Sequence, residues 1–177
     1  MILRATQTLS APLSEVFPFF ADAHNLALIT PPWLRFQILT KGNIEMRAGT
    51  VIEYRIGLGP VPLGWTSEIS AYEPMNRFVD EQRRGPYRHW VHEHRFTADG
   101  VRTVVEDTVN YLNPGGRVVH RLFVGPQLRR IFDHRSRTLR SIFGDDGASE
   151  LALLRDEAAV NAGCSIPRPS AYNGDPT

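Results

Sequence analysis

Hydrophobic residues near the N-terminus change from the spacing of a strand to that of a helix. The segment Ile2–Leu9 alternates imperfectly and is partly β-branched, which predicts a strand with one buried face. Apolar residues between Leu13 and Phe20 recur at helical spacing, although Pro18 should strain or kink that helix. A second short helix is expected over His24–Ile29, and it must end there because Thr30 is followed by two prolines.

The middle of the chain has the pattern of consecutive strands, in which β-branched and aromatic runs are separated by turn residues. Six strands are predicted, over Leu34–Thr40, Thr50–Gly57, Leu63–Tyr72, Arg77–Arg84, Tyr87–Thr97 and Val101–Leu112. Their connections are short, and parallel crossovers would need longer ones. We therefore expect an antiparallel meander.

The pattern returns to helix after the sixth strand. Apolar residues recur at threes and fours from Val119 to Phe143, which predicts the longest helix of the chain. Pro126 lies within it, so either the helix begins near there after an irregular turn or it bends at that point. A short amphipathic helix is expected over Glu150–Val160. A mobile tail is expected over Asn161–Thr177, which is rich in proline, glycine, serine and asparagine.

Length and composition favour one domain. The chain has 177 residues, 42% of them apolar, enough for a single substantial core. We predict a domain over residues 1–144 and a C-terminal extension over residues 145–177. The 20 basic and 19 acidic residues give a formal net charge of +1, which predicts no affinity for nucleic acid. An arginine cluster at helical spacing is interpreted as a solvated helix face; it comprises Arg129, Arg130, Arg135, Arg137 and Arg140.

The compartment is inferred from what the sequence lacks. Its single cysteine, Cys164, excludes an internal disulfide. The N-terminus has no signal-peptide pattern, and no apolar run approaches the roughly 20 residues of a membrane span. We expect a cytoplasmic protein without membrane insertion, and nothing in the sequence fixes its oligomeric state.

The order of strand, two short helices, six strands and long helix resembles the helix-grip superfamily, also called SRPBCC or START-like. That superfamily includes START lipid-transfer domains, the birch-pollen allergens and polyketide cyclases. The resemblance covers residues 1–144 and is closest to a bacterial cyclase/dehydrase-like branch. It is carried by Ser14-Glu15-Val16-Phe17, Thr30-Pro31-Pro32, Trp65, Asp80-Glu81-Gln82 with Gly85-Pro86-Tyr87, the segment Trp90–Phe96, and Asp107-Thr108-Val109-Asn110-Tyr111.

The resemblance implies an α+β fold in which a curved antiparallel sheet of about seven strands has the long C-terminal helix over its concave face. It also implies a cavity between sheet and helix that holds a small, largely hydrophobic molecule. Strand parity then predicts which side chains face that cavity, because alternate residues point to the same face. The predicted ligand-binding residues are Phe78, Asp80, Gln82, Trp90, His92, His94, Phe96, Asp107, Val109, Tyr111 and Phe132.

Turn lengths predict the register of these strands. A four-residue loop over Thr97–Gly100 would place His94 opposite Thr103 and Trp90 opposite Asp107. Asp80 would lie near His92. This register predicts a polar group on an otherwise apolar face. The group comprises Asp80, Gln82, His92, His94 and Asp107.

Three interpretations of this polar group remain open at this stage. Buried polar groups cost about 1–3 kcal/mol each when unpaired, so these side chains must satisfy one another, orient a ligand or bind a metal. The metal interpretation rests on His92-x-His94 with Asp80 or Asp107 as a third ligand. Since His-x-His alone is a weak signal, no metal is predicted. No cofactor is predicted either, because the chain has no Gly-x-Gly-x-x-Gly motif and no phosphate loop.

Two main functions follow. The first is a carrier or sensor that binds a small hydrophobic molecule in the cavity. The alternative is a cyclase- or dehydratase-type enzyme in which His92 or His94, with Asp107 or Asp80, transfers a proton. The candidate catalytic residues are accordingly His92, His94 and Asp107. A third hypothesis is an interaction module whose tail contacts a partner.

Overall fold

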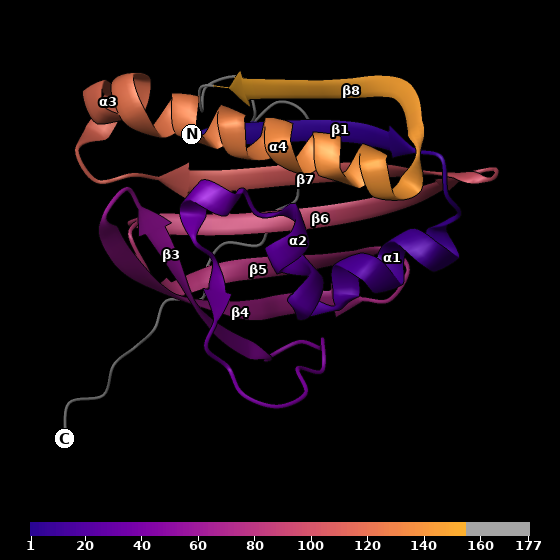
Figure 1. The fold of residues 1–177 in the computed structure, drawn as a ribbon, viewed down its shortest axis with the longest axis horizontal. Coiled ribbons are helices and arrows are strands. Elements are labelled where there is room, and N and C mark those ends of the chain that lie inside the picture. Colours follow the sequence, from indigo (N-terminus) through magenta and orange to yellow (C-terminus); the bar gives the residue numbers. More distant parts are fainter. Residues whose placement is uncertain (155–177) are drawn as a thin grey trace.

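The computed structural model describes residues 1–154, which form one antiparallel sheet with helices over one of its faces (Figure 1). The strands are β1 (Ile2–Leu9), β2 (Gln37–Ile38), β3 (Val51–Leu58), β4 (Val61–Glu73), β5 (Arg77–Arg84), β6 (His89–Asp99), β7 (Arg102–Leu112) and β8 (Asp145–Leu154). The helical segments are α1 (Leu13–Ala21), η1 (Ala23–Asn25), α2 (Leu26–Ile29), η2 (Pro32–Leu34), α3 (Gly116–Val119), η3 (His120–Val124) and α4 (Gly125–Phe143).

The sheet follows the order β2-β3-β4-β5-β6-β7-β1-β8. Strands β2 to β7 therefore form the predicted meander, and the N-terminal strand closes onto β7. The α+β fold with a curved antiparallel sheet and a long helix over its concave face is confirmed. The sheet has eight strands where about seven were expected.

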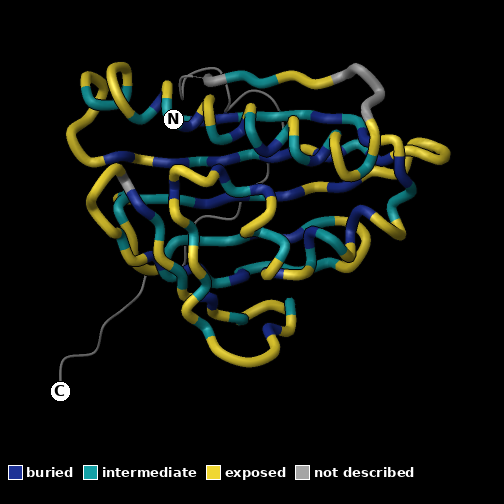
Figure 2. Tube along the Cα trace, in the orientation of Figure 1, coloured by how far each residue is buried: buried dark blue, intermediate teal, exposed yellow. Residues whose placement is uncertain are grey.

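Burial along β7 shows why this strand forms. Alternate side chains are buried and the residues between them are more exposed, the period-two pattern of a strand with one face against the core (Figure 2). Its inward set comprises Thr103, Val105, Asp107, Val109 and Tyr111. On β1, Leu3 and Leu9 are completely buried on the same face.

The turn between β6 and β7 is tighter than predicted. Asp99 pairs with Arg102 across a two-residue connection, so His94 lies opposite Asp107 and Trp90 lies opposite Tyr111. The predicted register was wrong by four residues along β7. Because the error is an even number, every inward residue stayed on the predicted face.

The helices cover the concave face in two groups. Helix α1 packs through Val16, Phe17 and Phe20, and it continues through Pro18. Helix α4 runs across β1 and β7 in Figure 1. Its regular turns begin at Gly125, directly after the π-helical segment η3, so the proline lies in the first turn, where its missing N–H is tolerated. Helical backbone precedes Gly125, so neither alternative for Pro126 is observed in full: the irregularity is a π-helical segment within a continuous helical stretch that begins at Gly116. Among residues 1–154, no helix has the length and hydrophobicity that a bilayer span requires.

The segment after α4 forms a strand, so the predicted short helix was wrong. Residues Glu150 to Leu154 belong to strand β8 instead of the expected short helix. Strand β8 pairs antiparallel with β1, and Leu151 packs against the cluster around Leu3. Pairing of backbone groups with an open sheet edge outweighs the weak helical pattern of this segment. The predicted tail over residues 161–177 lies outside the described residues.

Removal of β8 should destabilise the domain. A chain that ends at Gly144 exposes the edge of β1 and loses the packing of Leu151, so we expect its Tm to fall by about 5–10 °C. A chain that ends at Val160 keeps β8 and should melt within a few degrees of the full chain. Thermal unfolding followed by circular dichroism compares the two. Equal Tm values for the two truncations would contradict the pairing of β8 with β1.

Candidate functional site

A cavity of about 890 Å³ lies between the concave face of the sheet and the helical segments. Its wall is mainly apolar and rich in aromatic rings, among them Phe20, Tyr54, Trp65, Trp90 and Phe132. Trp65 and Trp90 meet edge to face with ring centroids 5.3 Å apart. A cavity of this size, shape and lining is typical of sites for small, largely hydrophobic ligands.

One part of the wall is polar, where β5 and β6 pass under the cavity. Asp80 on β5 is paired with His92 on β6, and His94 is paired with Asp107 on β7. His92, His94 and Asp107 are buried. The alternation of the strands therefore brings two carboxylates and two imidazoles together on the inner face. We call these four residues, with Arg135 of α4, the His–Asp cluster.

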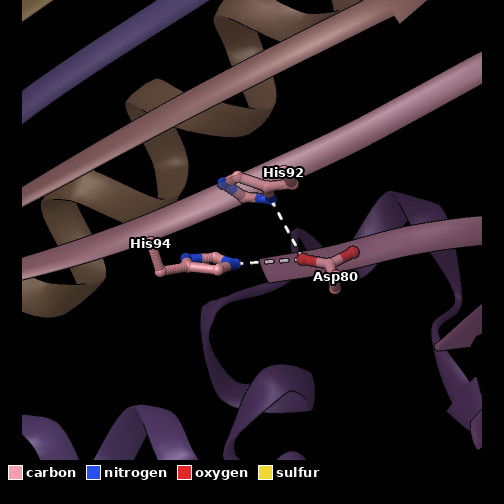
Figure 3. A group of neighbouring side chains, drawn as sticks. All are labelled: Asp80, His92 and His94. Atoms are coloured by element: carbon pink, nitrogen blue, oxygen red, sulfur yellow. Dashed lines mark hydrogen bonds and ion pairs between the residues drawn. The ribbon is translucent and has the colours of Figure 1, made fainter. Parts of the chain in front are cut away.

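Each histidine of the cluster lies between the two carboxylates. His92 has Nε2 3.0 Å from Asp107 Oδ1 and Nδ1 3.5 Å from Asp80 Oδ2. His94 is turned the other way, with Nδ1 2.7 Å from Asp107 Oδ1 and Nε2 3.1 Å from Asp80 Oδ2. The two rings lie against each other with centroids 3.8 Å apart. Figure 3 shows both histidines directed at the same oxygen of Asp80.

The carboxylates differ in their surroundings. Asp107 does not line the large cavity; it borders a smaller one of about 390 Å³ beside β1 and α4. Asp80 lines the large cavity together with His92 and His94. The cluster therefore lies between the two cavities, and the two histidines connect the carboxylate that lines the large one with the carboxylate that lines the small one.

Arg135 completes the cluster, and the sequence-based interpretation of this arginine was wrong. Its Nη2 donates to Asp107 Oδ1 at 3.3 Å, and the side chain is buried, with the guanidinium over the ring of Phe20. The helical spacing of the arginines had indicated a solvated helix face. The available signal was helical spacing. Arg135 follows Phe132 by three residues and precedes Leu139 by four, and both of these apolar residues lie on the buried stripe of the helix.

A second group of polar side chains supports Asp80 from β3 and β4. Trp65 Nε1 donates to Ser67 Oγ at 3.1 Å, and Tyr54 Oη lies 3.2 Å from the same atom. Ser67 Oγ is in turn 3.5 Å from Asp80 Oδ1, the oxygen that faces away from the histidines. Tyr54 and Ser67 were not among the predicted site residues. Parity on β4 places Ser67 on the same face as Trp65, which was the available signal.

The charges in the cluster shift the pKa values of its acids. Burial opposes ionisation of Asp107, but the charge of Arg135 and the hydrogen bonds from the histidines hold its pKa well below the usual value. Burial likewise opposes ionisation of Asp80, and the hydrogen bond from His94 together with the charges of both histidines lowers its pKa. Both carboxylates are therefore ionised at neutral pH.

The two histidines are shifted in opposite directions. Burial disfavours the charged form of His94, but its hydrogen bonds to Asp107 and Asp80 outweigh burial and raise its pKa. For His92, burial and then the neighbouring charge of His94 dominate and lower its pKa. One imidazolium and the guanidinium together balance the two carboxylates, and a second imidazolium would leave an uncompensated buried charge.

Three residues of the cluster offer the atom types that metal ions bind. The ligand atoms of Asp80, His92 and His94 all lie within 4.8 Å of one another. Imidazole nitrogens with one carboxylate oxygen suit zinc and other divalent transition metals.

The structure brings together only part of the predicted site. Phe78, Asp80, Trp90, His92, His94 and Phe132 line the cavity. Gln82 does not join the cluster; its side chain bonds the backbone N–H and C=O of Tyr87 and closes the β5–β6 turn. Phe96, Val109 and Tyr111 are buried in core packing and do not line the cavity. These three have the predicted parity, but tightly packed neighbours separate them from the cavity.

Comparison with known proteins gives the family and the fold of this chain. Residues 9–140 match the family described as polyketide cyclase / dehydrase and lipid transport, and the chain belongs to that family. The predicted membership of the helix-grip, or SRPBCC, superfamily is therefore confirmed. No curated protein sequence matches the chain significantly.

Solved structures show the same fold at low sequence identity. The Zhui aromatase/cyclase from a Streptomyces species is 20% identical with a TM-score of 0.63, over 80% of this chain and 92% of that one. The major latex-like protein 151 of ginseng, Panax ginseng, is 10% identical with a TM-score of 0.58, over 81% of this chain and 97% of that one. At these identities the likeness establishes the fold alone.

Loss of Arg135 should destabilise the protein in a pH-dependent way. Arg135→Leu leaves Asp107 without its guanidinium partner, and removal of one member of a buried ion pair typically costs about 3–5 kcal/mol. The low pKa of Asp107 stabilises the fold above the ordinary carboxyl pKa, and this contribution is lost as pH falls through its folded value. The deficit of the variant should therefore be largest near about pH 7 and shrink toward about pH 3.

Denaturant unfolding of both proteins across this pH range measures that deficit. Arg129→Leu is the matched control, since Arg129 is exposed on the same helix and should change stability by less than about 0.5 kcal/mol. A deficit that is independent of pH, or equal for the two variants, would rule out the Arg135–Asp107 ion pair as its cause.

Proposed function

We propose that this protein binds a small, largely hydrophobic molecule in its internal cavity, as a carrier or sensor. The observation that carries the proposal is the cavity of about 890 Å³ with a mainly apolar, aromatic wall. Burial of apolar surface, at about 25 cal/mol per Å², would supply most of the affinity. Family membership supports the same class of function.

The His–Asp cluster would give the cavity its selectivity. Asp80, His92, His94 and Arg135 are the cluster members that line the cavity and carry lone pairs or polar protons. A ligand with one carbonyl or hydroxyl group among apolar rings would place that group against them. Its apolar part would contact Trp65 and Trp90.

A second candidate function is proton transfer in a cyclase- or dehydratase-type reaction. The observation in its favour is that His92 lines the cavity and is held in the neutral form, which leaves one imidazole nitrogen able to act as a base. Asp107 accepts from Nε2 and would fix the proton there, so Nδ1 would be the basic atom. The structural likeness to an aromatase/cyclase is compatible with this candidate.

Binding of Nile red, a neutral hydrophobic dye, tests the first proposal. We expect saturable binding of one dye per protein with increased fluorescence. Leu63→Trp adds bulk to the cavity wall and should weaken binding by at least about tenfold, or 1.4 kcal/mol. Val61→Trp is the matched control because Val61 lies on the same strand, is exposed and does not line the cavity. Absence of saturable binding, or equal weakening by both variants, would contradict the proposal.

Exchange of the α-hydrogens of α-tetralone for deuterium tests the second candidate. The protein should accelerate this exchange above the buffer rate, and His92→Gln should abolish the acceleration while it preserves Nile red binding. Proton NMR follows the loss of the α-hydrogen signal. Undiminished exchange in the His92→Gln protein would exclude His92 as the base.

A further inference from the structure

We propose that Asp80, His92 and His94 form a binding site for one divalent transition-metal ion, with zinc as the first candidate. The proposal replaces the sequence-based expectation of no metal. It rests on the directions of four imidazole nitrogens and on the different positions of the two carboxylates, and it does not depend on which molecule the cavity binds.

The three ligand atoms have the spacing of a metal site. Asp80 Oδ2 lies 3.1 Å from His94 Nε2 and 3.5 Å from His92 Nδ1 (Figure 3). In a tetrahedral zinc site with bonds of about 2.0–2.1 Å, neighbouring ligand atoms are separated by roughly 3.3–3.4 Å. These two separations lie on either side of this value, and all three ligand atoms lie within 4.8 Å of one another.

The opposite nitrogens of both rings are held by one carboxylate. His92 Nε2 and His94 Nδ1 lie 3.0 and 2.7 Å from the same atom, Asp107 Oδ1. Histidine ligands of metals almost always donate their second N–H to such an acceptor, which fixes the tautomer and the ring orientation. Asp107 thus favours, in His92, the tautomer whose lone pair points toward Asp80. His94 Nδ1 also lies 3.2 Å from Nη2 of Arg135, and binding of the ion would displace the proton from His94 Nε2.

The surroundings of the two carboxylates indicate that Asp80 would be the metal ligand and that Asp107 would orient the histidines. Asp107 lies behind the histidines, outside the large cavity, and its charge is compensated by Arg135. The ion pairs that the structure shows for Asp80 within residues 1–154 are both with histidines. In the metal-free protein the imidazolium of His94 balances the charge of Asp80, and a bound cation would replace that proton as its partner. Ser67 holds its other oxygen, which leaves Oδ2 for the ion.

The site is open on one side. Asp80, His92 and His94 all line the cavity, so three protein ligands would leave at least one coordination position toward the bound molecule. Zinc sites with three protein ligands and one open position are those that bind water or substrate. The proposed ion would accept an oxygen atom of the ligand, such as a carbonyl, enolate or carboxylate oxygen. This last step alone rests on the proposed function.

Titration of the full-length, chelator-treated protein with Co²⁺ tests the site. We expect the visible absorption bands of four- or five-coordinate Co²⁺ to reach their maximum at one equivalent, and one equivalent of Zn²⁺ to remove them. Isothermal titration calorimetry with Zn²⁺ gives the affinity. No binding, or binding without a fixed stoichiometry, would overturn the proposal.

Single substitutions assign the ligands. Asp80→Asn and His94→Gln should weaken Zn²⁺ binding by more than about 100-fold, and Asp107→Asn should weaken it by roughly 10–100-fold. His134→Gln and His24→Gln are matched controls because neither residue belongs to the cluster, and both should bind Zn²⁺ like the native chain. Equal affinity of the Asp80→Asn or His94→Gln protein and the native chain would overturn the assignment.

A measurement on the native chain keeps the proposal testable even if a variant does not fold. Zinc K-edge X-ray absorption of the loaded protein should show nitrogen and oxygen ligands only, with the multiple scattering of two imidazoles. A spectrum without imidazole scattering would contradict the site. Nile red binding by the metal-free protein is measured in parallel, so failure of the metal site and failure of the cavity proposal give different results.

Discussion

Compensation of two buried carboxylates is the constraint on which the rest of this structure depends. Asp80 and Asp107 lie on the inner face of a sheet whose other inward residues are mostly apolar, where an unpaired charge costs several kcal/mol. Compensation comes from His92 and His94 on the strand between them and from Arg135 on α4. These contacts join β5, β6, β7 and the long helix at one place.

The same constraint helps to locate the helix and the cavity. Arg135 reaches Asp107 only if α4 crosses the sheet at the β7 side, and Leu128, Phe132 and Leu139 of the same stripe are buried there. On the other side of β6, toward β3, the sheet is covered by α1, α2 and η2. These segments contribute part of the cavity wall, together with the aromatic side chains of β3 to β6. The polar part of the cavity wall thus lies beside α4, and the aromatic part extends from there toward β3.

Stability alone is a poor explanation for this cluster. Well-packed hydrophobic residues often stabilise a fold as much as a buried ion-pair network of similar volume, so a network that also faces a cavity suggests a task beyond packing. One carboxylate of the cluster, Asp107, lies outside the large cavity and is compensated by Arg135, whereas Asp80 lines that cavity together with the two imidazoles. That asymmetry is what ligand orientation, proton transfer and metal binding would each use.

The sequence by itself determined the N-terminal strand, the meander and the face on which Asp80, His92, His94 and Asp107 lie, because these follow from local periodicity. The fold class came from the resemblance of the whole element order to a known superfamily. It could not determine which inward residues reach the cavity, since Phe96, Val109 and Tyr111 have the same parity but are covered by packing. Only the tertiary structure decided the partner of Asp107, because Arg135 is 28 residues away along the chain. Strand β8 was decided in the same way: its local pattern favours a helix, and the open edge of β1 supplies backbone hydrogen bonds that no local signal reveals.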